Sequence, residues 1–185
     1  MAYNEQHIIR RVLQGDTSAF GELFDRYGQR VYGLVARLTG DRVEAEDIVQ
    51  DVFLKAYTGL ASFKAKSSFS TWLFRIAYNS ALMRVRQRRF PTLSIDDTQI
   101  DAVTDAMATA ALADMSEHRI ATLQKAISLL TAEEQALVTL YYYDNQPVRN
   151  IAFILSLSET AVTTRLHRIR KRLYVMIQDL EHGTE

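Results

Sequence analysis

The sequence predicts an all-α protein: two small helical domains joined by an acidic linker, the second with a helix-turn-helix. Apolar residues recur along most of the chain at the i, i+3, i+4, i+7 spacing of amphipathic helices. The 185 residues include only 7 glycines and 2 prolines, so long helices can run uninterrupted. Residues 1–89 carry 14 Lys and Arg against 9 Asp and Glu, residues 90–118 none against 6, and residues 119–185 carry 8 against 7. We therefore expect domains over residues 1–90 and 118–185 and a linker over residues 91–117.

Three helices are expected before residue 61. A short helix over residues 5–14 ends at Gly15, and a second helix, capped by Asp16, stops at Gly40. A third helix begins at Asp41 and runs to about Leu60. The apolar positions expected to be buried in the second and third helices are Phe20, Leu23, Phe24, Tyr27, Val31, Val35 and Leu38, and Ala45, Ile48, Val49, Val52, Phe53, Ala56, Tyr57 and Leu60.

The polar side of the third helix is acidic, with Glu44, Glu46, Asp47, Gln50 and Asp51. One interpretation is a solvated face, since acidic residues near a helix N-terminus are favoured by the dipole. The other is a docking surface for a basic partner helix.

A fourth helix over residues 69–89 begins after a cap at Ser67 or Ser68 and ends before Pro91. Its apolar stripe is predicted to be buried and comprises Phe69, Trp72, Leu73, Ile76, Ala77 and Met83.

The opposite side of the fourth helix and the loop before it combine cations, aromatic rings and hydroxyls. Such a surface suits stacking on an unpaired base while neutralising the adjacent backbone, although a solvated basic face is the simpler interpretation. The candidate residues are Phe63, Lys64, Lys66, Ser67, Arg75, Tyr78, Asn79 and Arg86, with Arg89 also pointing away from the stripe.

The linker holds Asp96, Asp97, Asp101, Asp105, Asp114 and Glu117, with some helix expected around residues 107–113. It is either a plain solvated tether or a segment whose negative charge follows a cationic channel or shields the chain's own basic faces.

The second domain contains the helix-turn-helix. Thr131 and Glu134 form a capping box, Pro147 suits a first helical position, and Ser158 caps the last helix. Ser156 occupies the turn position that often holds glycine, which is tolerable if its φ stays negative or the turn relaxes. Short hydroxyls and cations face outward near the start of the last helix, where they can reach base edges and phosphates. These residues are Ser158, Thr160, Thr163, Thr164, Arg165, His167, Arg168 and Lys171.

Other function classes find little support in the composition. The sequence has no cysteine, its four histidines show no ligand spacing, and it lacks a nucleophile elbow or phosphate-binding glycine loop, so we expect neither an enzyme nor a cofactor or metal. No signal peptide or membrane-spanning run is apparent, so the expected location is cytoplasmic, without membrane insertion.

Three segments resemble the extracytoplasmic-function (ECF) subfamily of sigma-70-type sigma factors. FKAKSSFSTWLFRIAYN (residues 63–79) resembles its promoter-melting segment, and AEDIVQDVFLKAY (residues 45–57) resembles the segment that binds the clamp helices of the largest polymerase subunit. Residues 130–173 resemble the domain that reads the −35 element. The chain departs from the family pattern at Met83, Asn150 and Thr163.

The resemblance implies a sigma factor that binds core RNA polymerase, through the clamp helices and the flap region, and directs it to promoter DNA. Residues 1–90 would be the region 2-like domain, docking through Asp47, Gln50 and Asp51 and capturing a melted −10 base. Residues 118–185 would be the region 4-like domain that reads the −35 element. The acidic segment over residues 90–118, 29 residues long, leaves little room for the extra domain of larger sigma factors. An anti-sigma factor is a further implied partner.

Two other classes remain open from the residues alone. A stand-alone helix-turn-helix regulator would use the first domain for dimerisation and bind a palindromic operator without polymerase. A helical adaptor with no nucleic-acid partner would bind its target independently of salt, whereas phosphate contacts weaken steeply with salt.

Overall fold

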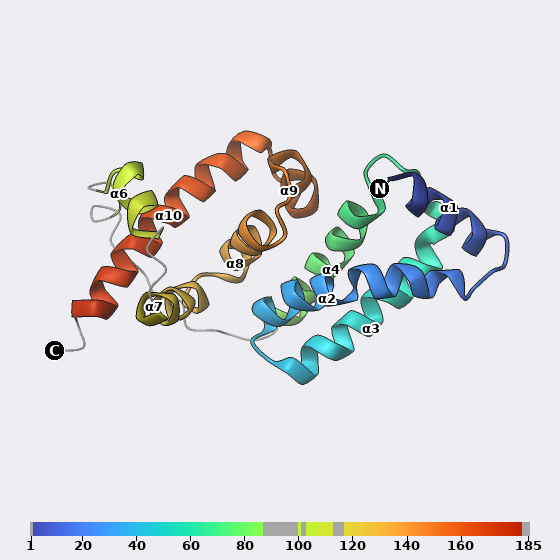
Figure 1. Cartoon of the computed structure of the whole chain (residues 1–185), viewed down its shortest axis with the longest axis horizontal. Helices are drawn as coiled ribbons and strands as arrows, with labels where there is room; N and C mark the ends of the chain where they lie inside the picture. Colours follow the sequence, from blue (N-terminus) through green and yellow to red (C-terminus); the bar gives the residue numbers. More distant parts are fainter. Residues whose placement is uncertain (1, 87–99, 101–102, 113–116, 183–185) are drawn as a thin grey trace.

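The computed structural model is all-α over the residues that it describes, 2–86, 100, 103–112 and 117–182. Helices α1 (Ala2–Leu13), α2 (Ala19–Thr39), α3 (Arg42–Gly59) and α4 (Phe69–Arg86) form a first unit, with a 3₁₀ turn, η1, at Leu60–Ser62. Helices α6 (Asp105–Leu112), α7 (Glu117–Ser128), α8 (Ala132–Val138), α9 (Val148–Leu155) and α10 (Glu159–His182) form a second unit, with a π-helical turn, η2, at Thr139–Tyr143. The two units lie side by side, with α8 and α9 against α2 and α4 (Figure 1). The all-α class predicted from the apolar spacing is confirmed.

Local hydrogen bonds explain where the helices of the first unit begin and end. Gly40 ends α2 with a φ of 66°, and the Asp41 carboxylate then accepts hydrogen bonds from the Val43 and Glu44 amides at 2.9 and 3.1 Å. The hydroxyl of Ser68, rather than that of Ser67, accepts from the Thr71 amide at 3.1 Å and caps α4. These caps set the starting points of α3 and α4, the two helices that carry the predicted docking and base-capture residues.

The second unit contains the predicted helix-turn-helix, with α9 as its first helix and α10 as its second. The capping box between Thr131 and Glu134 is present, and the Ser158 hydroxyl accepts from the Ala161 amide at 3.1 Å. Of the two ways in which serine was expected to be tolerated at position 156, a negative φ is not the one found, because this residue has φ 57° and ψ 44°. The left-handed turn lets the Ser156 and Leu157 amides return to the Ala152 carbonyl, which closes α9 before α10 begins.

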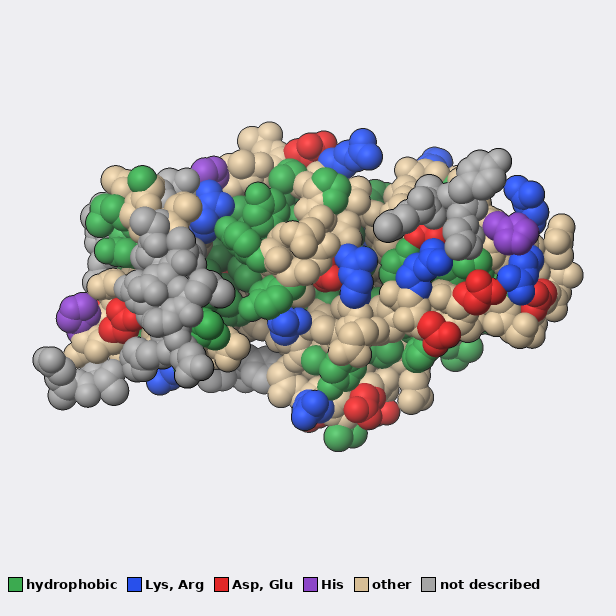
Figure 2. Space-filling model, in the orientation of Figure 1, with side chains coloured by type: hydrophobic (Ala, Val, Ile, Leu, Met, Phe, Trp, Pro, Cys, Tyr) green, Lys and Arg blue, Asp and Glu red, His purple; other side chains and the backbone are tan. Residues whose placement is uncertain are grey.

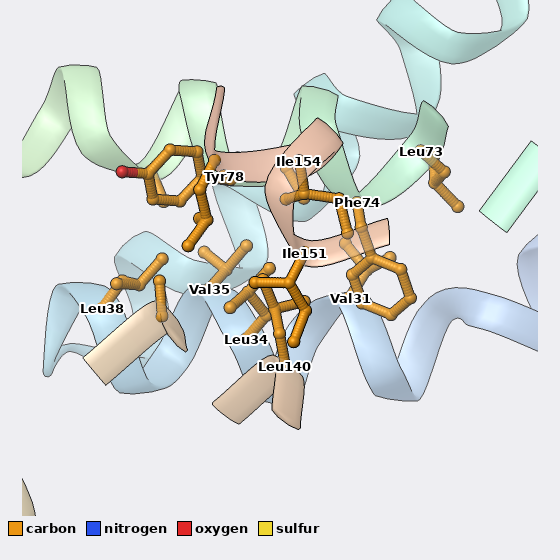
Figure 3. Packing of buried hydrophobic residues seen from close by; sticks show 14 of the residues in the cluster. Val31, Leu34, Val35, Leu38, Leu73, Phe74, Tyr78, Leu140, Ile151 and Ile154 are labelled. Carbon is orange, nitrogen blue, oxygen red and sulfur yellow. The ribbon is translucent and has the colours of Figure 1, made fainter. Parts of the chain in front are cut away.

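Most of the buried side chains of both units form one continuous hydrophobic core (Figure 3), and a smaller separate cluster of Val103, Ala108 and Val175 joins α6 to α10. At the boundary, Leu34 on α2 and Phe74 on α4 lie against Leu140, Ile151 and Ile154 of the second unit, and all five are 0% exposed. The apolar spacing predicted two helical domains, and we did not infer from it that they would share a core.

Several side chains differ in exposure from the prediction, and the shared core explains one of them, Tyr78. Helix α4 packs on its own unit on one side and on α9 on another, so its buried arc is wider than a single stripe. Tyr78, predicted to point away from the core, is therefore only 6% exposed, whereas Met83, predicted to be buried, is 62% exposed. Phe24 and Tyr57 are also more open than predicted, at 46% and 38%.

Helix α6 confirms the helical stretch expected around residues 107–113 and packs against α10. Most of the acidic residues that motivated the linker hypothesis lie outside the described residues, namely Asp96, Asp97, Asp101 and Asp114. Arg89 also lies outside them.

Candidate functional site

The acidic face of α3 points to solvent. Asp47, Gln50 and Asp51 are all exposed, and two exposed apolar residues, Val43 at 72% and Leu54 at 62%, extend the same face. On this helix, residues 43, 47, 50 or 51, and 54 recur at intervals of three or four, so they form one stripe. The stripe combines negative charge with apolar contact area, which suits a protein partner with basic and apolar side chains.

Phe53 serves the interior, as expected. It is 5% exposed, with its ring centroid 4.7 Å from that of Phe24 and 6.3 Å from that of Phe20. These rings join α3 to α2 and keep the acidic stripe turned outward.

The loop between η1 and α4 presents two lysines beside an aromatic cluster. Ala65 has a φ of 51°, and this left-handed turn separates Lys64 from Lys66, both of which are exposed. Phe63 is half-buried, with its ring centroid 5.0 Å from that of Trp72 and 6.0 Å from that of Phe69. The loop therefore offers a partly open aromatic surface with cations next to it, the arrangement that base stacking requires.

Two surface hollows lie beside α4, and one of them adjoins this loop. A cavity of about 410 Å³ on the α3–α4 side is lined by Asn79, Trp72, Lys55 and Met83, among others, so the predicted residue Asn79 is accessible. A second cavity of about 450 Å³ lies between the loop and α9. Its walls are Lys66, Ser67, Ser68 and Thr71 on one side and Arg149, Asn150 and Phe153 on the other. The loop thus faces the second unit as well as solvent.

Two of the predicted base-capture residues are occupied by the second unit. The Arg75 guanidinium lies 4.7 Å from the centroid of the Phe153 ring and donates to the Ser156 hydroxyl at 3.3 Å. Tyr78 is buried at the boundary, and burial raises the pKa of its phenol above the ordinary value, with a further contribution from the charge of Glu133. Neither side chain is open to a nucleic acid in this arrangement.

Glu133, on α8, joins the two predicted DNA-binding surfaces. Its carboxylate oxygens lie 3.6 Å from Arg86 of α4 and 3.6 Å from Arg165 of α10. Arg86 belongs to the predicted −10 set and Arg165 to the predicted −35 set, so one carboxylate faces a cation from each.

Arg30 and Arg37 of α2 complete the polar contacts across the boundary. Arg30 donates to the Asp144 carboxylate at 2.9 Å and to the Asp144 carbonyl at 3.0 Å, and Arg37 lies 4.1 Å from the centroid of the Tyr143 ring.

The pKa of the Asp144 carboxyl is nevertheless raised, because burial outweighs the hydrogen bond from Arg30. A raised pKa means that this group favours the packed form at acidic pH and that its contribution is lost as pH rises through the raised value. At neutral pH the ionised Asp144 therefore costs stability relative to an exposed carboxylate.

The outward face of α10 remains open. Thr160, Thr163, Thr164, His167 and Arg168 are exposed, and Lys171 is half-buried. Ser158 is exposed but accepts a hydrogen bond as the helix cap, and Arg165 lies on the side that faces Glu133. On the described part of the face drawn in Figure 2, Lys and Arg are scattered singly over both units, and hydrophobic side chains gather over α8 and the adjoining part of α10.

Sequence reasoning missed the residues that join the units. It assigned no role to Arg30, Arg37, Glu133, Tyr143 or Phe153. One signal was available: in α9, VRNIAFIL, apolar residues occupy more of the circumference than a one-sided helix needs. Such a helix is expected to pack against two neighbours.

Two further site types are not found in the described part of the chain. None of its helices is long and apolar enough to cross a bilayer. No group of three or more His, Cys, Asp or Glu side chains within it is placed to hold a metal ion.

Comparison with sequence families gives two matches in the order of the two units. The family model described as Sigma-70 region 2 matches residues 23–90, and the model described as Sigma-70, region 4 matches residues 120–173.

Two characterised relatives match over nearly their full lengths. The chain is 33% identical over 180 residues to the ECF RNA polymerase sigma factor SigW of Bacillus subtilis, a match that covers 93% of this chain and 96% of the relative. It is 31% identical over 185 residues to the ECF RNA polymerase sigma-E factor of Escherichia coli K12, with 95% of each chain covered.

Solved structures show the same fold at lower identity. CnrH in complex with the cytosolic domain of CnrY matches with a TM-score of 0.68 and 23% identity, over 92% of this chain and 95% of that one. The sigma factor RpoE in complex with the anti-sigma factor NepR, from Bartonella quintana, matches with a TM-score of 0.64 and 19% identity, over 86% and 96%.

The boundary between the units yields a direct prediction. Ile154→Asp places an unpaired charge in the shared core, which costs about 3 kcal/mol or more, so the units should separate. We expect the radius of gyration from small-angle X-ray scattering to rise by roughly 3 Å or more above the compact value, about 16 Å for a chain of this length. Far-UV circular dichroism should keep its helical signal. Leu13→Asp, the same change at a position that is 54% exposed, is the control and should leave the radius unchanged. A compact Ile154→Asp variant would contradict the boundary described here.

Proposed function

Because the chain belongs to the ECF subfamily of sigma-70 sigma factors, we propose that each of its two units takes the part in transcription initiation that its exposed residues support. The chain directs promoter-specific transcription initiation with RNA polymerase. The region 2 match falls on the unit with the acidic stripe and the aromatic loop, and the region 4 match falls on the helix-turn-helix. This coincidence is the observation that carries the proposal, and it favours a sigma factor over a stand-alone regulator.

In this proposal, α3 docks on the clamp helices of the polymerase. Asp47, Gln50 and Asp51 supply the polar contacts, and the exposed Val43 and Leu54 supply apolar area beside them. Charged groups in such an interface guide encounter and orientation, while apolar neighbours keep the complex together.

The loop over residues 63–68 and the start of α4 capture a base of the −10 element. A base stacked on the aromatic surface at Phe63 gains roughly 1–3 kcal/mol, which is comparable to the few kcal/mol needed to extrude it from a duplex. The loop can thus hold an extruded base but cannot open a duplex by itself. Lys64 and Lys66 neutralise the backbone next to that base, and Asn79 lines the hollow between α3 and α4, to which Trp72 also contributes.

The outward face of α10 reads the −35 element in the major groove. Its threonines, His167 and Arg168 approach base edges, and Lys171 approaches a phosphate. Ser158 holds the first turn of this helix in shape.

The packed arrangement of the two units must open for both elements to be read at once. The −10 and −35 elements are separated by about 25 base pairs, or roughly 85 Å of straight duplex. In the structure, Arg75 of α4 lies 3.3 Å from Ser156, directly before α10. The 18 residues of 87–104, between the end of α4 and the start of α6, can span about 60 Å when fully extended, so the units can move apart without unwinding α6. We therefore propose that the packed form is a resting state and that polymerase selects the separated one.

We also propose an anti-sigma factor as a partner of the resting form. Support comes from RpoE of Bartonella quintana, which is similar in fold and whose structure is a complex with the anti-sigma factor NepR.

Docking is tested by Asp51→Arg in the full-length chain. Reversing this exposed charge should weaken binding to core polymerase about tenfold, a loss of about 1.4 kcal/mol, and lower run-off transcription in proportion. Asp25→Arg, at an exposed acidic position of α2, is the matched control. Equal binding of Asp51→Arg and Asp25→Arg to core polymerase would refute the docking role of α3. The function itself would be refuted if the wild-type chain started no transcription with core polymerase.

Base capture is tested by Phe63→Leu, which keeps an apolar side chain against Phe69 and Trp72 but removes the aromatic face. We expect about tenfold fewer open complexes in permanganate footprinting and little change in closed-complex binding, because stacking contributes only after melting. Phe63→Tyr keeps the ring and should behave as wild type. Equal losses in both complexes would contradict a role confined to the melted base.

A further inference from the structure

We propose that the cavity between α9 and the loop that precedes α4 binds a nucleotide, with its phosphates between Lys66 and Arg149 and its base against Phe153. The cavity measures about 450 Å³. Small-molecule sites typically measure roughly 300–1,000 Å³, and a phosphate alone needs far less room. The site goes beyond the proposed function, and only its effect on polymerase binding rests on the resting state proposed above.

Two exposed cations line this cavity, one from each unit. Lys66 comes from the loop and Arg149 from the first turn of α9. Neither forms an ion pair within the described part of the chain, and the described residues that line the cavity include no Asp or Glu. Arg30 and Arg86, at the same boundary, each have an acidic partner. The positive charge of this cavity is therefore available to an anion.

Neutral donors adjoin the two cations. The Ser67 hydroxyl contacts the Ser68 carbonyl at 3.3 Å, which is longer than an ordinary hydroxyl hydrogen bond, so it can turn toward a ligand. The Asn150 amide donates one hydrogen to Gln146 at 3.1 Å and retains a second. A phosphate group has more acceptor oxygens than a carboxylate, so it matches donors on both walls of the cavity better.

An aromatic ring completes the cavity on the α9 side. Phe153 is 36% exposed, and the Arg75 guanidinium lies 4.7 Å from the centroid of its ring and holds the ring in place. An aromatic side chain beside phosphate-binding cations is the combination on which nucleobases stack, and such stacking tolerates any base. The ring therefore favours a nucleotide over an inorganic phosphate without selecting one base.

A ligand in this cavity touches both units, so it binds the packed form in preference to the separated one. Lys66 and Ser67 are also assigned to base capture, and the ligand would cover them. Because linkage is reciprocal, a nucleotide at ten times its Kd should lower the apparent affinity of the free chain for core polymerase about tenfold. The site would thus couple nucleotide binding to the resting state.

Binding is tested by calorimetric titration of the full-length chain with ATP, without Mg²⁺ and at physiological ionic strength. We expect saturable binding of ATP, and about tenfold weaker binding of inorganic triphosphate because it lacks the base. Arg149→Met and Lys66→Met should each weaken ATP binding about tenfold or more, the effect of losing a charge-assisted hydrogen bond. Lys125→Met, which removes an exposed cation from α7, is the control and should bind ATP as wild type does.

The role of the ring is tested by Phe153→Leu. This variant keeps an apolar side chain on α9 but removes the aromatic face. It should bind ATP no more tightly than inorganic triphosphate, and its affinity for triphosphate should equal that of wild type. This comparison separates stacking of the base from attraction of the phosphates.

The proposal is overturned by any of four results: no saturable binding of ATP, unchanged binding in Arg149→Met, an equal loss in Lys125→Met, or triphosphate that binds as tightly as ATP. The resting state is tested separately, by the affinity for core polymerase with and without ATP. ATP should weaken polymerase binding of the wild-type chain but not of Arg149→Met. Saturable ATP binding that leaves the wild-type affinity for polymerase unchanged would contradict the resting state and leave the nucleotide site standing.

Discussion

The packing of apolar side chains across the boundary between the two units is the constraint on which the rest of the structure depends. Leu34, Phe74, Leu140, Ile151 and Ile154 are fully buried there, and each can stabilise the packed form by up to the roughly 1.5–3 kcal/mol of complete burial. Partly exposed ion pairs contribute about 0–1 kcal/mol each, and the raised pKa of Asp144 shows that its burial is not fully compensated by Arg30. The polar contacts therefore fix how the two units are oriented at the boundary, while burial of the apolar side chains supplies most of its stability.

The same boundary decides which functional side chains are available. Arg75 and Tyr78 are engaged by the second unit, and Glu133 faces both Arg86 and Arg165. In this arrangement one carboxylate is paired with an arginine from each of the two predicted DNA-binding sets. The acidic stripe of α3 and the outward face of α10 stay exposed, so in the proposed mechanism an encounter with polymerase begins before the units separate. Separation then requires a partner whose binding free energy exceeds the cost of exposing the boundary.

Much of the fold could be predicted from local patterns. The caps at Asp41, Thr131 and Ser158 and the order of the helices follow from short-range hydrogen bonding and apolar spacing, which are properties of neighbouring residues. The outward position of Asp47, Gln50 and Asp51 follows from the same periodicity. The burial of Tyr78 could not be predicted, because it depends on a helix more than 70 residues away in the sequence. The positive φ of Ser156 could not be predicted for another reason. Closing α9 onto the Ala152 carbonyl imposes a left-handed conformation that a serine does not itself favour. The DNA-contact roles stay predictions, since they concern a partner.

The most direct test is the distance between the two units, measured between two spin labels by double electron-electron resonance spectroscopy. The sequence has no cysteine, so Gln29→Cys on α2 and Asp179→Cys on α10, both at exposed positions, place the only spin labels. We expect one narrow distance distribution for the free chain and a shift of tens of ångströms to longer distances on addition of core polymerase and promoter DNA. A broad distribution in the free chain, or an unchanged distance in the complex, would contradict a packed resting state that opens for transcription.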